Sequence, residues 1–300
     1  MIICVPNKMD ALKSLYYVLR PTRLPKSINL HCGVIFHTEE IQQPATFSQL
    51  IHFCQQYVSI TGKRALCTVM SPENPSIRKQ MNQLGVSGDE LARRLHQLRE
   101  WADIGYHGHF WKSTDKPFSE PVNQIKAGNF EAADEPGIRA QFKAEMDWFQ
   151  QNGFTIRSYS AGWWFVNPFL MKLLGENHLV LDFSFSQQPW VNNTWAKNFL
   201  ASNNIMFGQS FREKTGPVFV QTLMGFTSSN YPMDFVRILN RFLPSQGVVT
   251  GMITTHDYNI ASARELENTL KVIRLLSTHL NVAFCSEADF LRTSAPIPIE

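Results

Sequence analysis

Two histidines separated by one glycine, His107 and His109, have the type and spacing that point most directly to chemistry. Residues two apart in an extended strand lie on the same face, so both imidazoles would project together. Imidazole nitrogen is a common ligand of zinc and other divalent transition metals, and an anionic group often completes the set. The consecutive acids Glu39 and Glu40 could supply that group. We predict a divalent metal, with zinc the expected ion, held by His107, His109 and one of the two glutamates, Glu39 or Glu40, and keep a metal-free site as the alternative.

A second group of polar residues offers the acid and the base that a hydrolase needs. With one of the two glutamates on the metal, the other is free to act as a general base on the attacking water. His256 is the expected general acid, because the amine of a cleaved amide must be protonated as it leaves. Asp182 and Arg157 complete the predicted catalytic set, with Asp257 or Asp182 available to orient charged groups.

Short apolar segments precede these polar residues and are typical of strands buried on both faces of a parallel sheet. The predicted strands are residues 30–36, 65–70, 104–107, 154–156, 179–181, 217–223, 248–254 and 282–285. Longer amphipathic stretches between them indicate helices, so we predict an α/β fold that forms a distorted seven- or eight-stranded (β/α) barrel. Strands of a parallel barrel all end on one face, so polar residues that are distant in sequence would converge on one pocket there.

Two long segments interrupt the alternation of strands and helices, at residues 112–137 and 184–216. Both begin shortly after a predicted strand, on the face where the functional loops of such a barrel gather. We expect both inserts to border the pocket and to supply substrate specificity, within a single catalytic domain covering residues 1–300. Trp163, Trp164 and Trp190 could stack on sugar rings through their apolar faces.

The composition of the 300 residues, 44% hydrophobic and 18% charged, indicates a globular protein. A net charge of +3 without a basic run predicts neither a nucleic acid nor an anionic membrane as partner, and it leaves the oligomeric state open. No apolar stretch reaches the roughly 20 residues of a membrane-spanning helix, and the apolar start of the chain is too short for a secretory signal. The five cysteines form no CxxC pair, which favours reduced thiols and a cytoplasmic location.

The order of the motifs resembles the polysaccharide deacetylase, or NodB-homology, family. The matching segments are residues 36–40 (FHTEE), 103–111 (DIGYHGHFW), 156–163 (IRSYSAGW), 180–184 (VLDFS) and 251–256 (GMITTH). The resemblance covers residues 28–292 and implies a distorted (β/α) barrel that removes acyl groups from amino sugars with a divalent metal. In that family the first of two acids after the first strand is the general base and the second is a metal ligand, so the resemblance implies Glu39 as the base and Glu40 as a ligand beside His107 and His109. The last strand of the family ends in the catalytic histidine, here His256.

Three departures from the family pattern widen the functional prediction. Glu39 and Glu40 replace two aspartates, Trp111 stands where the second histidine of the motif is expected, and no proline follows Arg157. The leading prediction is a metal-assisted hydrolase that removes an acyl or formyl group from an N-acylated sugar. The alternatives are a metal-independent hydrolase of another non-peptide C–N bond on the same fold, and a non-catalytic carbohydrate-binding barrel.

Overall fold

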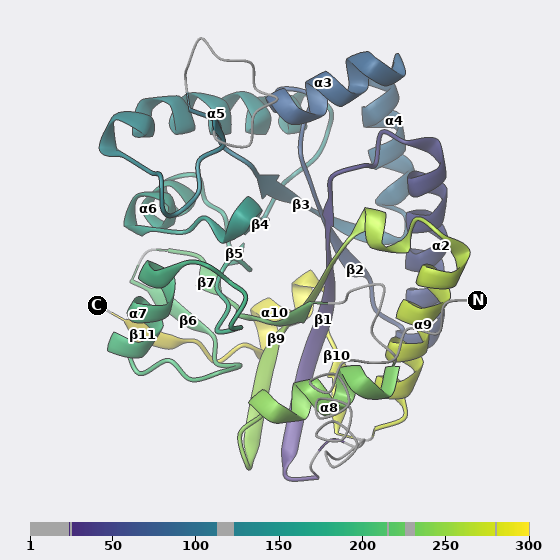
Figure 1. Cartoon of the computed structure of the whole chain (residues 1–300), viewed down its shortest axis with the longest axis vertical. Coiled ribbons are helices and arrows are strands. Elements are labelled where there is room, and N and C mark those ends of the chain that lie inside the picture. Colours follow the sequence, from purple (N-terminus) through teal and green to yellow (C-terminus); the bar gives the residue numbers. More distant parts are fainter. Residues whose placement is uncertain are drawn as a thin grey trace, which may run out of the picture.

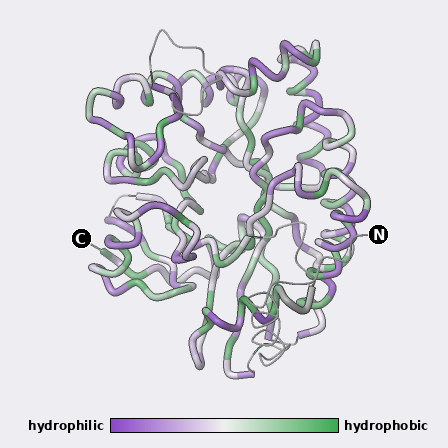
Figure 2. Tube along the Cα trace, viewed as in Figure 1, coloured by the Kyte–Doolittle hydropathy of each residue, from purple (hydrophilic) through white to green (hydrophobic). Residues whose placement is uncertain are grey.

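The computed structural model describes residues 24, 26–112, 123–214, 216–225, 232–279 and 281–299, with only the main chain of residues 232–234. A curled sheet runs through the middle of the molecule, and helices cover its outer side (Figure 1). Hydrophobic residues concentrate in the central strands and alternate with hydrophilic ones along the helices (Figure 2). This distribution is expected for strands that are covered on both faces.

Eleven strands form the sheet, as far as the described residues extend, in the order β11-β6-β7-β5-β4-β3-β2-β1-β9-β8, and β10 pairs with β1 outside that path. The strands are β1 (Ile28–Thr38), β2 (Ala65–Val69), β3 (Ala102–Gly108), β4 (Ser158–Ala161), β5 (Leu181–Asp182), β6 (Phe211–Glu213), β7 (Val218–Phe219), β8 (Thr222–Gly225), β9 (Gly247–His256), β10 (Val282–Phe284) and β11 (Ile297–Ile299). The β6–β7 pair is antiparallel. The central strands, from β9 through β1 to β5, pair in parallel, so their carboxyl ends share one face.

Helices alternate with the strands along the chain, and several of them begin at a residue whose side chain accepts a hydrogen bond from an N–H of the first turn. They are α2 (Pro44–Thr61), α3 (Pro75–Leu84), α4 (Gly88–Leu98), α5 (Glu135–Gln151), α6 (Pro168–Glu176), α7 (Thr194–Ser202), α8 (Pro232–Phe242), α9 (Ala263–Ser277) and α10 (Glu287–Thr293), with short 3-10 helices η2 (Ala132–Asp134), η3 (Gly162–Trp164) and η4 (Asp257–Ile260). The Asn74 side chain accepts from the N–H of Ser76 at the start of α3, which supplies a partner for a helix N–H that has none within the helix.

Strand β1 shows how the chain separates its two faces. Cys32, Val34 and Phe36 belong to the core between the sheet and the surrounding helices. Ile35 belongs to a second cluster, inside the barrel, which draws residues from strands around the sheet and Phe290 from α10. Side chains alternate along a strand, so His37 shares the inward face of Ile35. The barrel interior is thus apolar in its middle and becomes polar where β1 ends.

Several sequence-based strand predictions need correction. Residues 154–156 form no strand, and β4 begins at Ser158. Their apolar side chains close the end of α5 instead: the Phe154 N–H donates to the Phe149 carbonyl, and its ring stacks on His96. The predicted strand 217–223 divides into β7 and β8, and β6 and β11 were not predicted. The sheet therefore has more strands than expected, although its central parallel part agrees with the predicted barrel.

Two further sequence-based expectations concern membrane spans and thiols. Among the residues that the structure describes, no helix is long and apolar enough to cross a membrane. Cys32, Cys54, Cys67 and Cys285 are buried free thiols, as expected, while Cys4 lies outside the described residues.

Candidate metal centre

His107 and His109 reach the barrel mouth because their strand has two differently filled sides. Tyr106 points outward, where its ring contacts Phe142 and Phe149 of α5, so His107 faces inward. The glycine between the histidines is required by space, because a Cβ at Gly108 would lie 2.6 Å from Cε2 of Tyr159. The His-Gly-His spacing therefore reflects both the pleat of β3 and the tyrosine packed behind it.

A second glycine makes room for the imidazole of His109. A Cβ on Gly162 would lie 2.5 Å from Cγ of His109, so the ring packs directly against the main chain at the start of η3. Gln124, from the described part of the first insert, touches Nδ1 of His109 through its side-chain amide. This contact brings part of the insert 112–137 to the site, whereas residues 113–122 lie outside the described chain.

The hydrogen bonds of His107 fix which nitrogen faces the centre. Nδ1 lies 3.0 Å from the carbonyl oxygen of Ser160, which can only accept, so Nδ1 carries the proton and donates. Nε2 then has a free lone pair, the form in which imidazole ligates a metal. A carbonyl partner on the far ring nitrogen is the usual outer support of a metal-binding histidine.

Glu39 supplies the carboxylate that meets the histidines. Its Oε1 lies 3.5 Å from Nε2 of His107 and 3.3 Å from Nε2 of His109, and the two Nε2 atoms are 2.9 Å apart. Ligands of a tetrahedral zinc ion, at bonds of about 2.1 Å, lie about 3.4 Å from one another. The two distances from Oε1 of Glu39 match this spacing, and the two Nε2 atoms would have to move apart by about 0.5 Å for the three donors to hold a divalent cation with one open position. Two imidazoles with one carboxylate also suit ferrous iron.

Glu40 was expected to be a metal ligand, but the conformation of the loop after β1 places Glu39 beside the histidines instead. Asp257, at the start of η4, accepts the N–H groups of Glu39 at 3.0 Å and of Glu40 at 2.8 Å. With the main chain clamped there, Glu39 continues the inward alternation of Ile35 and His37. The donor group comprises Glu39, His107 and His109 and does not include Glu40. Asp257 thus positions the loop rather than orienting substrate charges.

His256 closes the site from the end of β9. Its Nε2 lies 3.7 Å from Oε1 of Glu39, its side chain is 30% exposed, and its ring stacks on Tyr258. His37, which was given no role from the sequence, stacks on His107 with ring centroids 4.4 Å apart and meets His256 edge-on at 5.2 Å. Its position two residues before Glu39 was the available signal, because that spacing places both side chains on one face of β1.

The electrostatics of the cluster favour a state that can bind a cation. Burial lowers the pKa of His107 to about 4 and lowers the pKa of His37 well below its ordinary value. Burial would raise the pKa of Glu39, but the adjacent imidazoles of His107 and His109 outweigh it and hold that pKa well below the usual range. At neutral pH His37 and His107 are therefore neutral and lie beside one carboxylate, the state in which His107 and Glu39 can bind a metal.

Arg157 and Asp182 lie away from this cluster, contrary to the sequence-based expectation. Arg157 precedes β4 instead of following a strand, and it is exposed near Glu287 of α10. Asp182 is the outward-facing residue of β5, since its neighbour Leu181 belongs to the interior cluster. Its carboxylate accepts the N–H of Ser184 at 2.7 Å, and burial raises its pKa to about 7.

The second insert, residues 184–216, folds into α7 and β6. β6 pairs with β7, which extends the sheet, and Phe211 packs on Phe219. Asn193 donates to the carbonyl oxygens of Trp164 and Val166, so the insert supports the loop that follows β4.

No protein-family model and no curated protein sequence matches the chain. Its fold is similar to a candidate polysaccharide deacetylase from Mycobacterium smegmatis, with a TM-score of 0.55 and 12% identity over 94% of this chain and 97% of that one. It is also similar to a 4-alpha-glucanotransferase from Thermococcus litoralis, with a TM-score of 0.54 and 9% identity over 91% of this chain but only 41% of that one. A GH57 branching enzyme from Thermococcus kodakaraensis has a TM-score of 0.52 and 9% identity, over 90% of this chain and 72% of that one.

These similarities confirm the predicted fold, a distorted (β/α) barrel of the polysaccharide deacetylase type. They do not select a reaction, because a deacetylase-type protein and glycan-transferring enzymes share the architecture and function resides in the site. The choice between these chemistries rests on the residues at the carboxyl ends of the strands.

Proposed function

We propose that this protein is a metal-assisted hydrolase that removes an acyl or formyl group from an N-acylated sugar. The observation that carries the proposal is the convergence of Glu39, His107 and His109 at the mouth of a deacetylase-type barrel, with His256 beside them. When bound by those three residues, a divalent cation would supply Lewis-acid polarisation of the acyl carbonyl. Zinc is the ion we expect.

His256 performs the proton transfers in this proposal. Its imidazole is 30% exposed, so it can reach both substrate and solvent, while Glu39, 3.7 Å away, stabilises it when it is protonated. Burial lowers the pKa of His256, so the ring is neutral at pH 7 and can take a proton from water. The same ring then gives that proton to the nitrogen as the C–N bond breaks. Glu39, which we first expected to be the base, keeps that role only in the metal-independent alternative.

Among the residues that the structure describes, the carboxylates beside this cluster argue against glycoside transfer on this barrel. That chemistry ordinarily needs two free carboxyl groups, about 5 to 9.5 Å apart, across the sugar bond. Asp257 already accepts two main-chain N–H groups, and Glu39 is enclosed by imidazoles. A site with several histidines and one committed carboxylate suits amide hydrolysis better.

Two tryptophans after β4 support a sugar as the substrate. Trp163 is 54% exposed, and the ring of Trp164 lies 6.1 Å from that of His37. Both residues have positive φ, 53° and 57°, a strained conformation for bulky side chains that costs on the order of 1–3 kcal/mol each. We propose that Trp163 stacks on a sugar ring next to the scissile amide. Lys126, whose Nζ lies 3.6 Å from the Trp163 ring centroid, holds the indole in place.

Metal content and a substrate screen test the proposal together. The purified protein should contain about one equivalent of zinc or a similar ion, and a panel of N-acylated sugars should yield at least one that releases its carboxylic acid. Activity without metal would favour the metal-independent hydrolase. Binding of glycans without release of acid, whatever the metal content, would favour the non-catalytic barrel.

A further inference from the structure

His109 lies beyond the end of the sheet, so its position needs another explanation than strand pairing. Strand β3 ends at Gly108, whose partner on β4 is Ala161, whereas His107 is held by its own pairing with Ser160. A metal ligand just past a strand end is free to move unless other groups hold its main chain. The main chain after His109 pairs with the first insert, where the Ile125 N–H donates to the Phe110 carbonyl oxygen, and the carbonyl group of His109 itself is held by side chains from the N-cap of α3 and from α5.

Two side-chain amides hold the carbonyl oxygen of His109. Asn74 Nδ2 donates to it at 3.0 Å, and Gln141 Nε2 donates to it at 2.6 Å. Both nitrogens also donate to one oxygen of Glu145, at 3.1 Å and 2.8 Å. Burial raises the pKa of Glu145 to about 7, and above that pH its carboxylate can only accept, which requires both amides to present their NH₂ groups to this place.

The oxygens of the same amides are committed as well. Asn74 Oδ1 accepts the Ser76 N–H at the start of α3, and Gln141 Oε1 accepts the Trp111 N–H two residues after His109. A reversed amide would therefore lose contacts at both of its ends. Glu145 is completely buried and also accepts from the Tyr106 hydroxyl and the Ser71 N–H.

We infer that Glu145 is a positioning residue that sets the location of His109, and through it the affinity of the metal centre. No described hydrogen bond joins Glu145 to the side chains of the metal ligands, and it acts by orienting Asn74 and Gln141. The inference rests on the proposed metal centre for its effect on affinity, but the displacement of His109 that it predicts does not need a metal.

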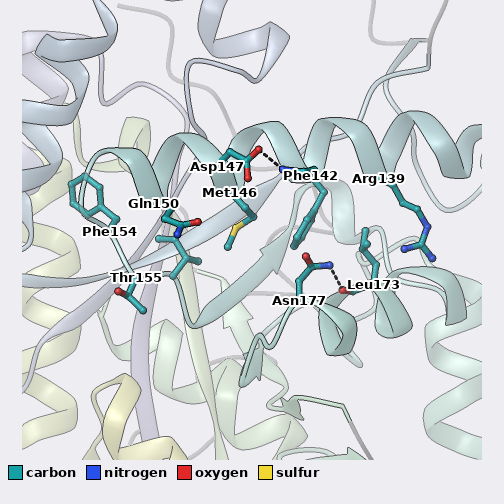
Figure 3. Close-up of a pocket in the computed structure, with 11 residues that line it drawn as sticks. Arg139, Phe142, Met146, Asp147, Gln150, Phe154, Thr155, Leu173 and Asn177 are labelled. Carbon is teal, nitrogen blue, oxygen red and sulfur yellow. Dashed lines mark hydrogen bonds and ion pairs between the residues drawn. The ribbon is translucent and has the colours of Figure 1, made fainter.

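Helix α5 offers a control position on its other side. A separate pocket of about 560 Å³ lies between α5 and α6, lined by Phe142, Met146 and Asp147 among others (Figure 3). Asp147 pairs there with Lys143 and has no described bond to the Glu145 network. Asp147→Asn therefore changes the same helix by the same chemical step without reaching His109.

Zinc affinity, measured by competition with a chromophoric chelator, is the first test. Glu145→Gln places an NH₂ group among the N–H and O–H groups that now donate to the Glu145 carboxylate, and Glu145→Leu removes that hydrogen-bond acceptor altogether. Groups that hydrogen-bond to metal ligands typically contribute about 10- to 100-fold to metal affinity. We therefore expect zinc affinity to fall about 10-fold in Glu145→Gln and about 100-fold in Glu145→Leu. Asp147→Asn should bind like the unchanged protein. Equal affinity in all four proteins would overturn the inference.

Two further measurements separate positioning from stability and from the proposed function. Tyr106→Phe removes a bond to Glu145 that does not lead to His109, so it should lower the melting temperature with little change in zinc affinity. In the metal-free protein, long-range ¹H–¹⁵N NMR of the imidazoles should show a shifted His109 and an unshifted His107 in Glu145→Gln. If the unchanged protein binds no zinc, the metal centre fails, and the NMR result alone decides the role of Glu145. An unmoved His109 signal would refute it.

Discussion

Exchange of Glu39 for glutamine should weaken zinc binding severely, whereas the same exchange at Glu40 should not. Glu39 is one of the three donors that converge, and it carries the charge of the set, while Glu40 follows it in the chain but is not part of the group. The two substitutions are chemically identical and one residue apart, so each is the matched control for the other.

The size of the effect follows from the number of ligands. Four-ligand structural zinc sites bind with about 10–16 kcal/mol, which is roughly 3 kcal/mol for each ligand. A loss of about 3 kcal/mol lowers affinity by more than about 100-fold. A neutral amide oxygen is a weaker ligand than a carboxylate, so Glu39→Gln should come close to that loss. Glu40→Gln should change affinity by less than about threefold, because the main-chain N–H of residue 40 still donates to Asp257.

Chelator competition at pH 7.5 would measure both affinities, and melting curves with excess chelator would show whether the metal-free folds are equally stable. If Glu40→Gln lost as much affinity as Glu39→Gln, the clamp at Asp257 would not select the ligand as we have argued. If neither variant lost affinity, the carboxylate would not be a ligand at all.

Three other substitutions test other parts of the molecule. His256→Ala should lower kcat by roughly 10² to 10⁴, the usual contribution of a positioned acid or base, while zinc affinity is retained; near-normal turnover would assign proton transfer elsewhere. Trp163→Gly should raise KM for a sugar substrate without lowering the melting temperature, because glycine accepts the φ of 53° without strain; an unchanged KM would remove the stacking role. Asp182→Asn should stabilise the protein at pH 8 but not at pH 4 in urea denaturation, since burial raises the pKa of Asp182 to about 7 from 3.8. Asp182 ionises at lower pH in the unfolded chain than in the folded protein, so it lowers the free energy of unfolding by up to about 4 kcal/mol as pH rises from about 4 to about 7. If Asp182→Asn shows the same fall as the unchanged protein, other groups cause it.

The central strands and their parallel direction could be predicted from the sequence, because the hydrophobic residues that a strand buries are close together in the sequence. Residues 30–36, 65–70 and 248–254 are continuous apolar segments, and they correspond to β1, β2 and β9. The spacing of His107 and His109 likewise placed two imidazoles on one side of β3, since the pleat of a strand depends only on the next two residues. Local patterns were less reliable where an apolar residue serves a helix end, as Phe154 does at α5.

The identity of the carboxylate at the centre was decided by tertiary structure. The sequence offered Glu39 and Glu40 as neighbours of equal chemistry, and only the clamp from Asp257, more than two hundred residues away, fixes which one faces inward. The register of β5 turned Asp182 outward in the same way, and the position of His109 depends on Glu145 through two amides. Apolar burial is encoded in short segments because each residue contributes to it separately, whereas a hydrogen-bonded site needs partners from several elements at fixed distances, and those exist only after the chain has folded.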